Sequence, residues 1–291
     1  DIRESDVTRA LRSVGMKVDI GHSRALVDGC DAVCASTGVP VDNIEMDEAR
    51  RRGVPALSRA GLLAALCSRA QTIGVAGTHG KTTTTSLLAW VFEHNGFHPS
   101  YLIGGIPRNF GQGARFTDSE WFIIEGDEYD TAFFDKRSKF VHYLPEVAII
   151  NNLEFDHADI FENLPAVQLA FRRLIQLVPR NGLLLANGDD PALAPLLDVK
   201  FCPVRRFGLG AANDTRATEL ALNADASEFN SGATRFKLGM TGELNVRNAL
   251  DENTLFPHRA VDRRDGTNRP AVVITRLNEP RTFVLTSSFS L

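Results

Sequence analysis

The residues with the clearest chemical potential form a short glycine-rich segment, 77–82, which reads G-T-H-G-K-T. Residues 72–76 before it are apolar enough for a buried strand, and residues 82–94 after it carry apolar side chains at helical spacing. Glycines let a backbone approach a phosphate, and the start of a helix directs free N–H groups at the anion. A lysine here supplies charge for terminal phosphates, and the following threonine hydroxyl is a ligand for Mg²⁺. The segment therefore predicts an enzyme that uses a nucleoside triphosphate.

The sequence motif of this segment is shorter than that of the usual phosphate loop. A Walker A loop needs a glycine five positions before Gly80, where this chain has Val75, and Gly74 is one residue away from that place. The alternative is a glycine turn that only joins a strand to a helix. That alternative leaves the Gly-Lys-Thr triplet at the start of the helix unexplained.

Acidic residues follow a second apolar run, 121–125, and read E-G-D-E-Y-D from Glu125 onward. They lie at the carboxyl end of a predicted strand, which is the edge where ligands bind in an open α/β sheet. Mg²⁺ prefers oxygen ligands and accompanies the phosphates of a nucleotide. We therefore expect Glu125 to hold the metal, with a solvated acidic turn as the alternative.

Two more polar segments follow the same logic. His157 lies among acids after the apolar run 147–151, where it can ligate a second metal or orient a phosphate, or can simply be a surface histidine. Asn245 and Asn248 are three residues apart and would share one face at the start of a helix. They can bond a nucleotide base or cap the helix, and the residues alone favour the cap.

Composition limits the partners of the chain. The formal net charge of the 291 residues is −4, so we expect no basic field for nucleic acid or a membrane. The apolar runs are shorter than a membrane span requires, and we expect no secretory leader, because no charged segment followed by an apolar one opens these residues. The four cysteines form no C-x-x-C pair, which favours reduced thiols in a cytoplasmic protein.

Helical and strand-like patterns alternate along most of the chain. Strands are predicted at 17–20, 32–35, 54–57, 72–76, 121–125, 147–151, 183–186 and 204–207. Helices are predicted from Ser5 to about Val14 and at 47–52, 59–67, 82–94, 166–178 and 191–197. This alternation predicts an α/β fold with a mostly parallel sheet, and residues from 251 onward lack a helical period.

The four polar segments together resemble those of the Mur ligase family of ATP-dependent enzymes that form amide bonds, and they occur in the family's order. The resemblance implies a truncated Rossmann-like UDP-binding domain at 1–70 and a P-loop-type central ATPase domain at 71–250. Residues 251–291 are then an atypical tail in place of the third ligase domain. We therefore expect the chain to be a fragment at both ends.

The resemblance also implies roles for single residues, with ATP and Mg²⁺ as cofactors. Lys81, Glu125 and His157 would be catalytic, and Lys81 would bind the β- and γ-phosphates. Thr82 and Glu125 would hold one Mg²⁺, while Glu125 and His157 would hold a second. The residues implied to contact ATP are Gly77, Thr78, His79, Gly80, Lys81, Thr82, Thr83, Asn245 and Asn248.

The stretch 129–161 resembles the murein-recycling branch of the family. This likeness implies a ligase that joins UDP-N-acetylmuramate to the tripeptide L-Ala-γ-D-Glu-meso-diaminopimelate through an acyl phosphate. One alternative is ligation of UDP-N-acetylmuramate to L-alanine, because residues 1–66 resemble both kinds of enzyme. The other alternative is an inactive nucleotide-binding fragment.

Overall fold

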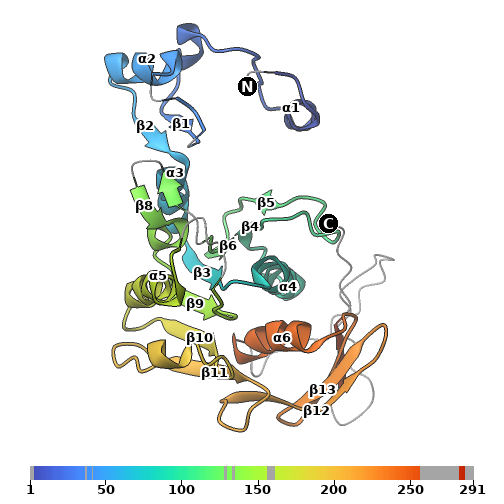
Figure 1. Cartoon of the computed structure of the whole chain (residues 1–291). Coiled ribbons are helices and arrows are strands. Elements are labelled where there is room, and N and C mark those ends of the chain that lie inside the picture. The colour runs from blue at the N-terminus through green and yellow to red at the C-terminus, as the bar shows by residue number, and fades with distance from the viewer. Residues whose placement is uncertain are drawn as a thin grey trace. The chain divides into compact units, whose positions relative to one another are not determined.

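The computed structural model describes residues 3–36, 38–40, 42–127, 130–132, 135–155, 161–255 and 282–285. The chain forms two compact units, one of residues 1–65 and 131–135 and one of residues 66–130 and 136–291 (Figure 1). Every candidate residue named above that the structure describes lies in the second unit.

The first unit alternates short helices and strands. Its elements are α1 (Asp6–Ser13), η1 (Arg24–Val27), β1 (Val33–Ala35), α2 (Ile44–Arg52), β2 (Ala56–Ser58) and most of α3 (Arg59–Cys67). Strands β1 and β2 pair in parallel, with Val33 opposite Ala56. The helix predicted to start after Ser5 is confirmed as α1.

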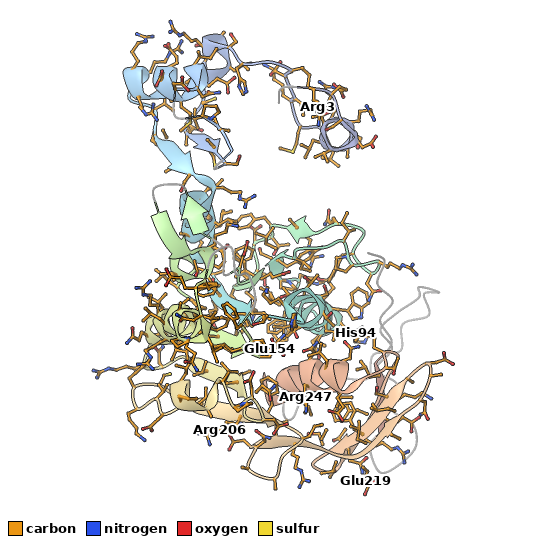
Figure 2. The ribbon with its side chains drawn as sticks, in the orientation of Figure 1. Arg3, His94, Glu154, Arg206, Glu219 and Arg247 are labelled. Carbon is orange, nitrogen blue, oxygen red and sulfur yellow. The ribbon has the colours of Figure 1, made fainter. Side chains whose placement is uncertain are left out.

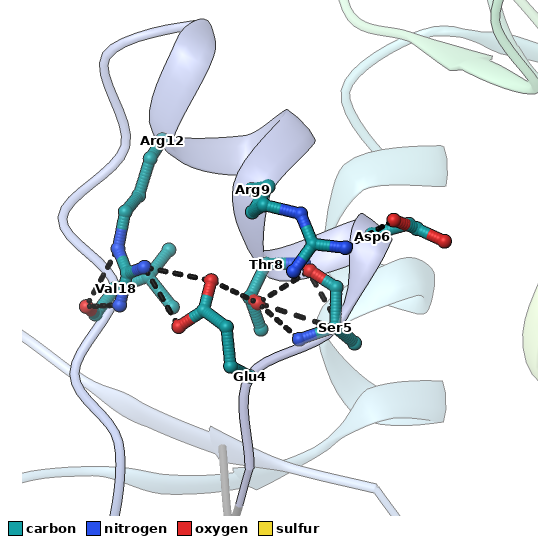
Figure 3. Close-up of polar contacts among 7 residues, drawn as sticks. All are labelled: Glu4, Ser5, Asp6, Thr8, Arg9, Arg12 and Val18. Carbon is teal, nitrogen blue, oxygen red and sulfur yellow. Dashed lines mark hydrogen bonds and ion pairs between the residues drawn. The ribbon is translucent and has the colours of Figure 1, made fainter.

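Side-chain bonds fix the start of α1 (Figure 3). The Ser5 hydroxyl accepts a bond from the Thr8 N–H at 3.2 Å, and the Thr8 hydroxyl accepts one from the Ser5 N–H at 2.8 Å. Two donors at the helix start are thereby satisfied. Arg12 pairs with Glu4 at 2.8 Å, and this hydrogen-bonded guanidinium lowers the pKa of the Glu4 carboxyl.

Among its described residues, the second unit is built on an 11-stranded sheet with the order β15-β14-β13-β12-β11-β10-β9-β3-β6-β4-β5. Strands β6, β3, β9, β10 and β11 pair in parallel, which confirms the predicted α/β class with a mostly parallel sheet. Strands β12, β13 and β14 pair antiparallel and extend one side of it.

The elements of the second unit follow in chain order. The strands of its large sheet are β3 (Gln71–Ala76), β4 (Ser100–Leu102), β5 (Ala114–Arg115), β6 (Trp121–Glu125), β9 (Val147–Ile150), β10 (Leu183–Asn187), β11 (Val204–Gly208), β12 (Thr215–Leu222), β13 (Ser227–Ser231), β14 (Thr234–Leu238) and β15 (Thr282–Leu285). A separate two-stranded sheet joins β7 (Asp130–Ala132) and β8 (Asp135–Ser138). The helices are α4 (Lys81–His94), η2 (Lys139–His142), α5 (Leu164–Leu177), η3 (Ala194–Leu196) and α6 (Glu243–Leu255).

Helices cover both faces of the parallel part of the sheet (Figure 1). On one face, Leu88 of α4 and Val246 of α6 join the core that contains Ile73 and Ile149 of the strands. Helix α5 buries its own apolar side chains, including Phe171, apart from that cluster. Within the described ranges, no helix has the length and apolar character that crossing a bilayer requires.

Two sequence-based elements are wrong. Residues 17–20 form no strand. The Arg12 guanidinium donates a hydrogen bond to the Val18 carbonyl at 2.9 Å, and Gly21, at φ +90°, turns the chain. Residues 191–197 form a turn and the short η3 instead of an α-helix. Pro195 lies inside that stretch, where it lacks an N–H and disfavours a continuing helix.

The first residues of the predicted tail are helical, although no helical period was found from residue 251 onward. Helix α6 continues to Leu255, past the predicted domain boundary at residue 250. The apolar run 283–285 forms most of β15, which pairs in parallel with β14. Residues 271–274, which are also apolar, lie outside the described residues.

Candidate active site

The glycine-rich segment joins the central strand β3 to α4, as the sequence predicts. Gly77 has φ +144° and Gly80 has φ +79°, and both values favour glycine over residues that carry a Cβ. A Cβ on Gly77 would meet the backbone nitrogens of Asn151 and Asn152 at 3.2 Å. Lys81 begins the helix directly after Gly80, so the free N–H groups of α4 face the loop.

The strand order brings three polar segments to one edge. Strand β3 lies between β6 and β9, with Val75 opposite Glu125 and Ala76 opposite Ile150. The residues after these strands therefore meet at the carboxyl edge of the sheet. Because the chain leaves β3 toward one neighbour and later returns beside the other, this edge is a topological switch point, where ligands bind in such folds.

Glu125 ties the end of β6 to the start of α4. Its Oε1 accepts a bond from the Thr82 hydroxyl at 3.0 Å, and its Oε2 accepts one from the Gly104 N–H at 2.7 Å. A Cβ on Gly104 would lie 2.8 Å from that Oε2, so a larger residue here would displace the carboxylate. The contribution of Gly104 was not predicted, because its sequence context carries no sign of a contact with Glu125.

The other acids after β6 are only partly described. Asp127 pairs with Lys139 at 2.6 Å, and Glu128 lies outside the described residues. His157, the predicted second metal ligand, also lies outside them. Its role stays a prediction.

Lys81 is folded against the loop that precedes it. Its Nζ donates to the carbonyl of Gly77 at 2.6 Å and to that of Thr78 at 3.2 Å. The ammonium charge is thereby held over the loop. Thr83 is half-buried in the first turn of α4.

Two adjacent asparagines after β9 hold the loop in shape. Asn152 accepts a bond from the His79 N–H at 2.7 Å through Oδ1 and donates to the His79 carbonyl at 3.1 Å through Nδ2. Asn151 donates to the Thr84 hydroxyl at 3.0 Å. Both asparagines belong to the polar segment that contains His157, but no role was predicted for them, because the contact between Asn152 and His79 spans 73 residues.

The outer side of the loop contacts Glu154, which is labelled in Figure 2. The Thr78 hydroxyl accepts a bond from the Glu154 N–H at 2.9 Å. The carboxylate of Glu154 lies 3.5 Å from the His79 ring, and both side chains are exposed. This side of the loop therefore faces solvent.

The two asparagines of α6 have different surroundings. Asn245 donates to the Thr241 carbonyl at 2.9 Å, so it does not cap the free N–H groups of the helix. Asn248 is 2% exposed and lies against Gly80, whose Cβ position is 2.8 Å from the Asn248 Nδ2. The prediction that these two asparagines cap the helix is therefore wrong.

The residues of this edge fit a phosphate group with its divalent cation. The hydroxyl of Thr82 and the carboxylate of Glu125 offer neighbouring oxygen ligands, the type that Mg²⁺ prefers. The positive φ values of Gly77 and Gly80 shape a turn of the kind that binds anions through its N–H groups, and Lys81 holds a positive charge there. The arrangement can stabilise charge that moves between phosphate groups.

The chain belongs to the Mur ligase family. Residues 75–251, more than half of the chain, match the Mur ligase middle domain, and residues 1–71 match a domain described as Mur ligase family, catalytic domain. Members of this family are ATP-dependent ligases, which generally use Mg²⁺.

Individual relatives are named for two reactions. A UDP-N-acetylmuramate–L-alanyl-gamma-D-glutamyl-meso-2,6-diaminoheptandioate ligase from Haemophilus influenzae is 46% identical over 183 residues, which are 61% of this chain and 40% of the relative. A UDP-N-acetylmuramate–L-alanine ligase from Variovorax paradoxus is 34% identical over 259 residues, 86% of this chain and 52% of the relative. The chain thus spans about half or less of the length of these curated relatives.

A solved structure supports the same comparison. The crystal structure of the UDP-N-acetylmuramate:L-alanyl-gamma-D-glutamyl-meso-diaminopimelate ligase from Neisseria meningitides superposes with a TM-score of 0.77 at 38% identity. The match covers 90% of this chain and 85% of that one.

Proposed function

We propose that this chain belongs to an ATP-dependent ligase that joins UDP-N-acetylmuramate to the tripeptide L-alanyl-γ-D-glutamyl-meso-diaminopimelate. The observation that carries the nucleotide part is the Thr82–Glu125 pair, 3.0 Å apart beside the glycine loop. The choice of tripeptide is supported by the higher identity to the Haemophilus ligase, 46%, than to the Variovorax L-alanine ligase, 34%.

In this proposal the reaction passes through an acyl phosphate. The carboxylate of UDP-N-acetylmuramate attacks the γ-phosphorus of ATP, ADP leaves, and the amine of the tripeptide then displaces phosphate from the acyl carbon. Lys81 neutralises charge on the transferred phosphoryl group, while Thr82 and Glu125 hold Mg²⁺. Bound Mg²⁺ supplies further neutralisation of that charge.

The remaining predicted residues take supporting roles. Gly77, Thr78, His79, Gly80 and Thr83 would surround the phosphates through the loop and the first turn of α4. His157 would hold a second Mg²⁺, and Asn245 would contact the adenine. The burial of Asn248 against Gly80 favours a role in the loop itself.

Calorimetry with Mg-ATP tests the nucleotide part on the 291-residue chain. Lys81→Ala removes a charged contact worth about 1.5–3 kcal/mol, so we expect affinity to fall roughly 10- to 150-fold. Lys200→Ala is the matched control, because Lys200 is an exposed lysine that pairs with Asp198. Equal affinity of the wild type and the Lys81 variant would remove the phosphate-loop assignment.

Phosphate release from ATP and UDP-N-acetylmuramate separates the candidate reactions. Release with the tripeptide but not with L-alanine supports the proposal, and the reverse supports an L-alanine ligase. Mg-ATP binding without release for either amine supports a nucleotide-binding chain that does not ligate. A cytoplasmic location stays a prediction.

A further inference from the structure

Residues 104–112 form a compact loop between β4 and β5, the two strands labelled beside α4 in Figure 1. We call it the β4–β5 loop. Its ends are joined by a hydrogen bond from the Ile103 N–H to the Gly113 carbonyl at 2.8 Å. Inside it, the Phe110 N–H donates to the Pro107 carbonyl at 3.0 Å and closes a turn. Closed ends and an internal turn are typical of an Ω-loop, a kind of loop that is frequently functional.

The first two residues of the β4–β5 loop lie against both candidate ligands of Mg²⁺. The Gly104 N–H donates to Oε2 of Glu125 at 2.7 Å. A Cβ on Gly105 would lie 3.3 Å from Cγ2 of Thr82. The next residue, Ile106, is 63% exposed, so the chain then runs out to the surface. The position of this loop therefore affects how the Thr82–Glu125 pair is held.

The far part of the β4–β5 loop is anchored by one aromatic ring, that of Phe110. The centroid of this ring lies 5.3 Å from that of Trp90 on α4 and 4.6 Å from that of Tyr101 on β4. The Arg115 guanidinium of β5 lies over the same ring, with its Cζ 5.6 Å from the centroid, and it also pairs with Glu93 of α4. Such ring and cation contacts add to the effect of apolar burial. Phe110 is thereby held by three elements outside its own loop.

This anchor leaves two polar groups unsatisfied. The Nε1 of Trp90 and the Nε of Arg115 are buried N–H donors that have no hydrogen-bond partner among the described residues. Both side chains flank Phe110. Buried donors are normally paired, and an unpaired one opposes the packing around it. Movement of the ring out of the cluster would expose these donors to water, which offsets part of the packing that is lost.

We propose that Phe110 is a positioning residue whose ring latches the β4–β5 loop against the Thr82–Glu125 pair and can release it. In the latched form, the Gly104 N–H fixes the Glu125 carboxylate in the orientation that binds Mg²⁺. In the released form that bond is lost, and the carboxylate turns freely. This role rests on the proposed function of Thr82 and Glu125 in binding Mg-ATP, and Phe110 acts on them through the loop.

Hydrogen exchange of the full chain without nucleotide tests the latch. Phe110→Ala should raise exchange of the backbone amides in 104–106 by about tenfold, because the ring no longer holds the loop while the chain stays folded. Phe116→Ala is the matched control, since Phe116 is a 53% exposed ring that lies near Arg69, and 104–106 should then exchange as in the wild type. Unchanged exchange in Phe110→Ala, or an equal rise in both variants, overturns the latch.

Two further substitutions at the same position keep this test decisive. Should Phe110→Ala fail to fold, Phe110→Leu retains most of the apolar volume without the ring, so faster exchange of 104–106 supports the latch and wild-type exchange overturns it. Phe110→Tyr retains the ring and should exchange as the wild type does. Exchange in Phe110→Tyr that is as fast as in Phe110→Ala contradicts the role of the ring.

The Mg²⁺ dependence of ATP binding tests the positioning role, which loss of stability alone would not change. Mg²⁺ should increase the ATP affinity of Phe110→Ala about fivefold less than that of the wild type, with equal affinities in EDTA, because the loop spends less time latched. Phe110→Tyr should restore the effect of Mg²⁺. An equal effect of Mg²⁺ on Phe110→Ala and the wild type overturns the positioning role. Failure of the wild type to bind Mg-ATP removes the proposed function instead, and the exchange measurement still judges the latch.

Discussion

The pair of hydrogen bonds between Asn152 and the His79 peptide offers a test of how the loop is held. Asn152→Ala removes the 2.7 Å bond from the His79 N–H and the 3.1 Å bond to the His79 carbonyl. One net hydrogen bond contributes about 0.5–1.5 kcal/mol, so the pair contributes roughly 1–3 kcal/mol. His79 is an exposed residue whose peptide groups can find water, so we expect the lower part, about 1–2 kcal/mol.

This free energy should appear as weaker nucleotide binding. A loop that spends less time in its binding shape lowers the apparent affinity by the same fraction. A loss of about 1–2 kcal/mol corresponds to Mg-ATP binding that is roughly 5- to 30-fold weaker. Calorimetry of the full chain with Mg-ATP measures the change, and urea unfolding shows that the variant remains folded.

Asn187→Ala is a matched control for this variant. Asn187 ends β10 of the same sheet, is 6% exposed where Asn152 is 8% exposed, and accepts one turn bond from the Asp189 N–H at 3.0 Å. Its loss should leave Mg-ATP affinity within about twofold, because no bond to the loop is removed. Unchanged affinity in Asn152→Ala, or equal weakening in both variants, would refute the reasoning.

Three further predictions follow from the same geometry and from burial. Mg²⁺ should increase the ATP affinity of Glu125→Gln about tenfold less than it increases that of the wild type, while the affinities of the two proteins in EDTA should be equal. An equal effect of Mg²⁺ on both proteins would contradict the metal role. Gly80→Ala should lose about 1–3 kcal/mol in urea unfolding, more than Gly96→Ala, because both have positive φ but only a Cβ at Gly80 meets a side chain, at 2.8 Å. Burial raises the pKa of the Cys67 thiol to about 12, so its thiolate is scarce at pH 8. Iodoacetamide should then label the exposed Cys30 first in the native chain, and equal labelling of the two would contradict this.

Local patterns predicted the central part of the fold well. The apolar runs at 72–76 and 121–125 became β3 and β6, because a strand buried on both faces needs continuous apolar residues. The helix after the glycine loop was also predicted, within one residue at its start. Each of these signals is contained in a few neighbouring residues.

Other parts lacked a strong local signal. Strands β12 to β14 were not predicted, because Ser227 and Ser231 occupy buried positions where the alternating pattern calls for apolar residues. The alternation around Phe229 and the turn at Gly232 were the available signs of this hairpin. The prediction of a helix at 191–197 was wrong because it relied on an apolar run that Pro195 interrupts.

The amino-acid pattern alone was enough to identify the loop, its lysine and the acid that faces it, since glycine spacing and strand ends are local properties. It also determined the family, because four polar segments follow the family's order. The side chains that hold the loop in shape became evident from the folded chain. The order of β6, β3 and β9 brings Asn151 and Asn152 beside the loop, and the packing of α6 adds Asn248. Such contacts depend on how strands pair and helices pack across the chain, which no short pattern records.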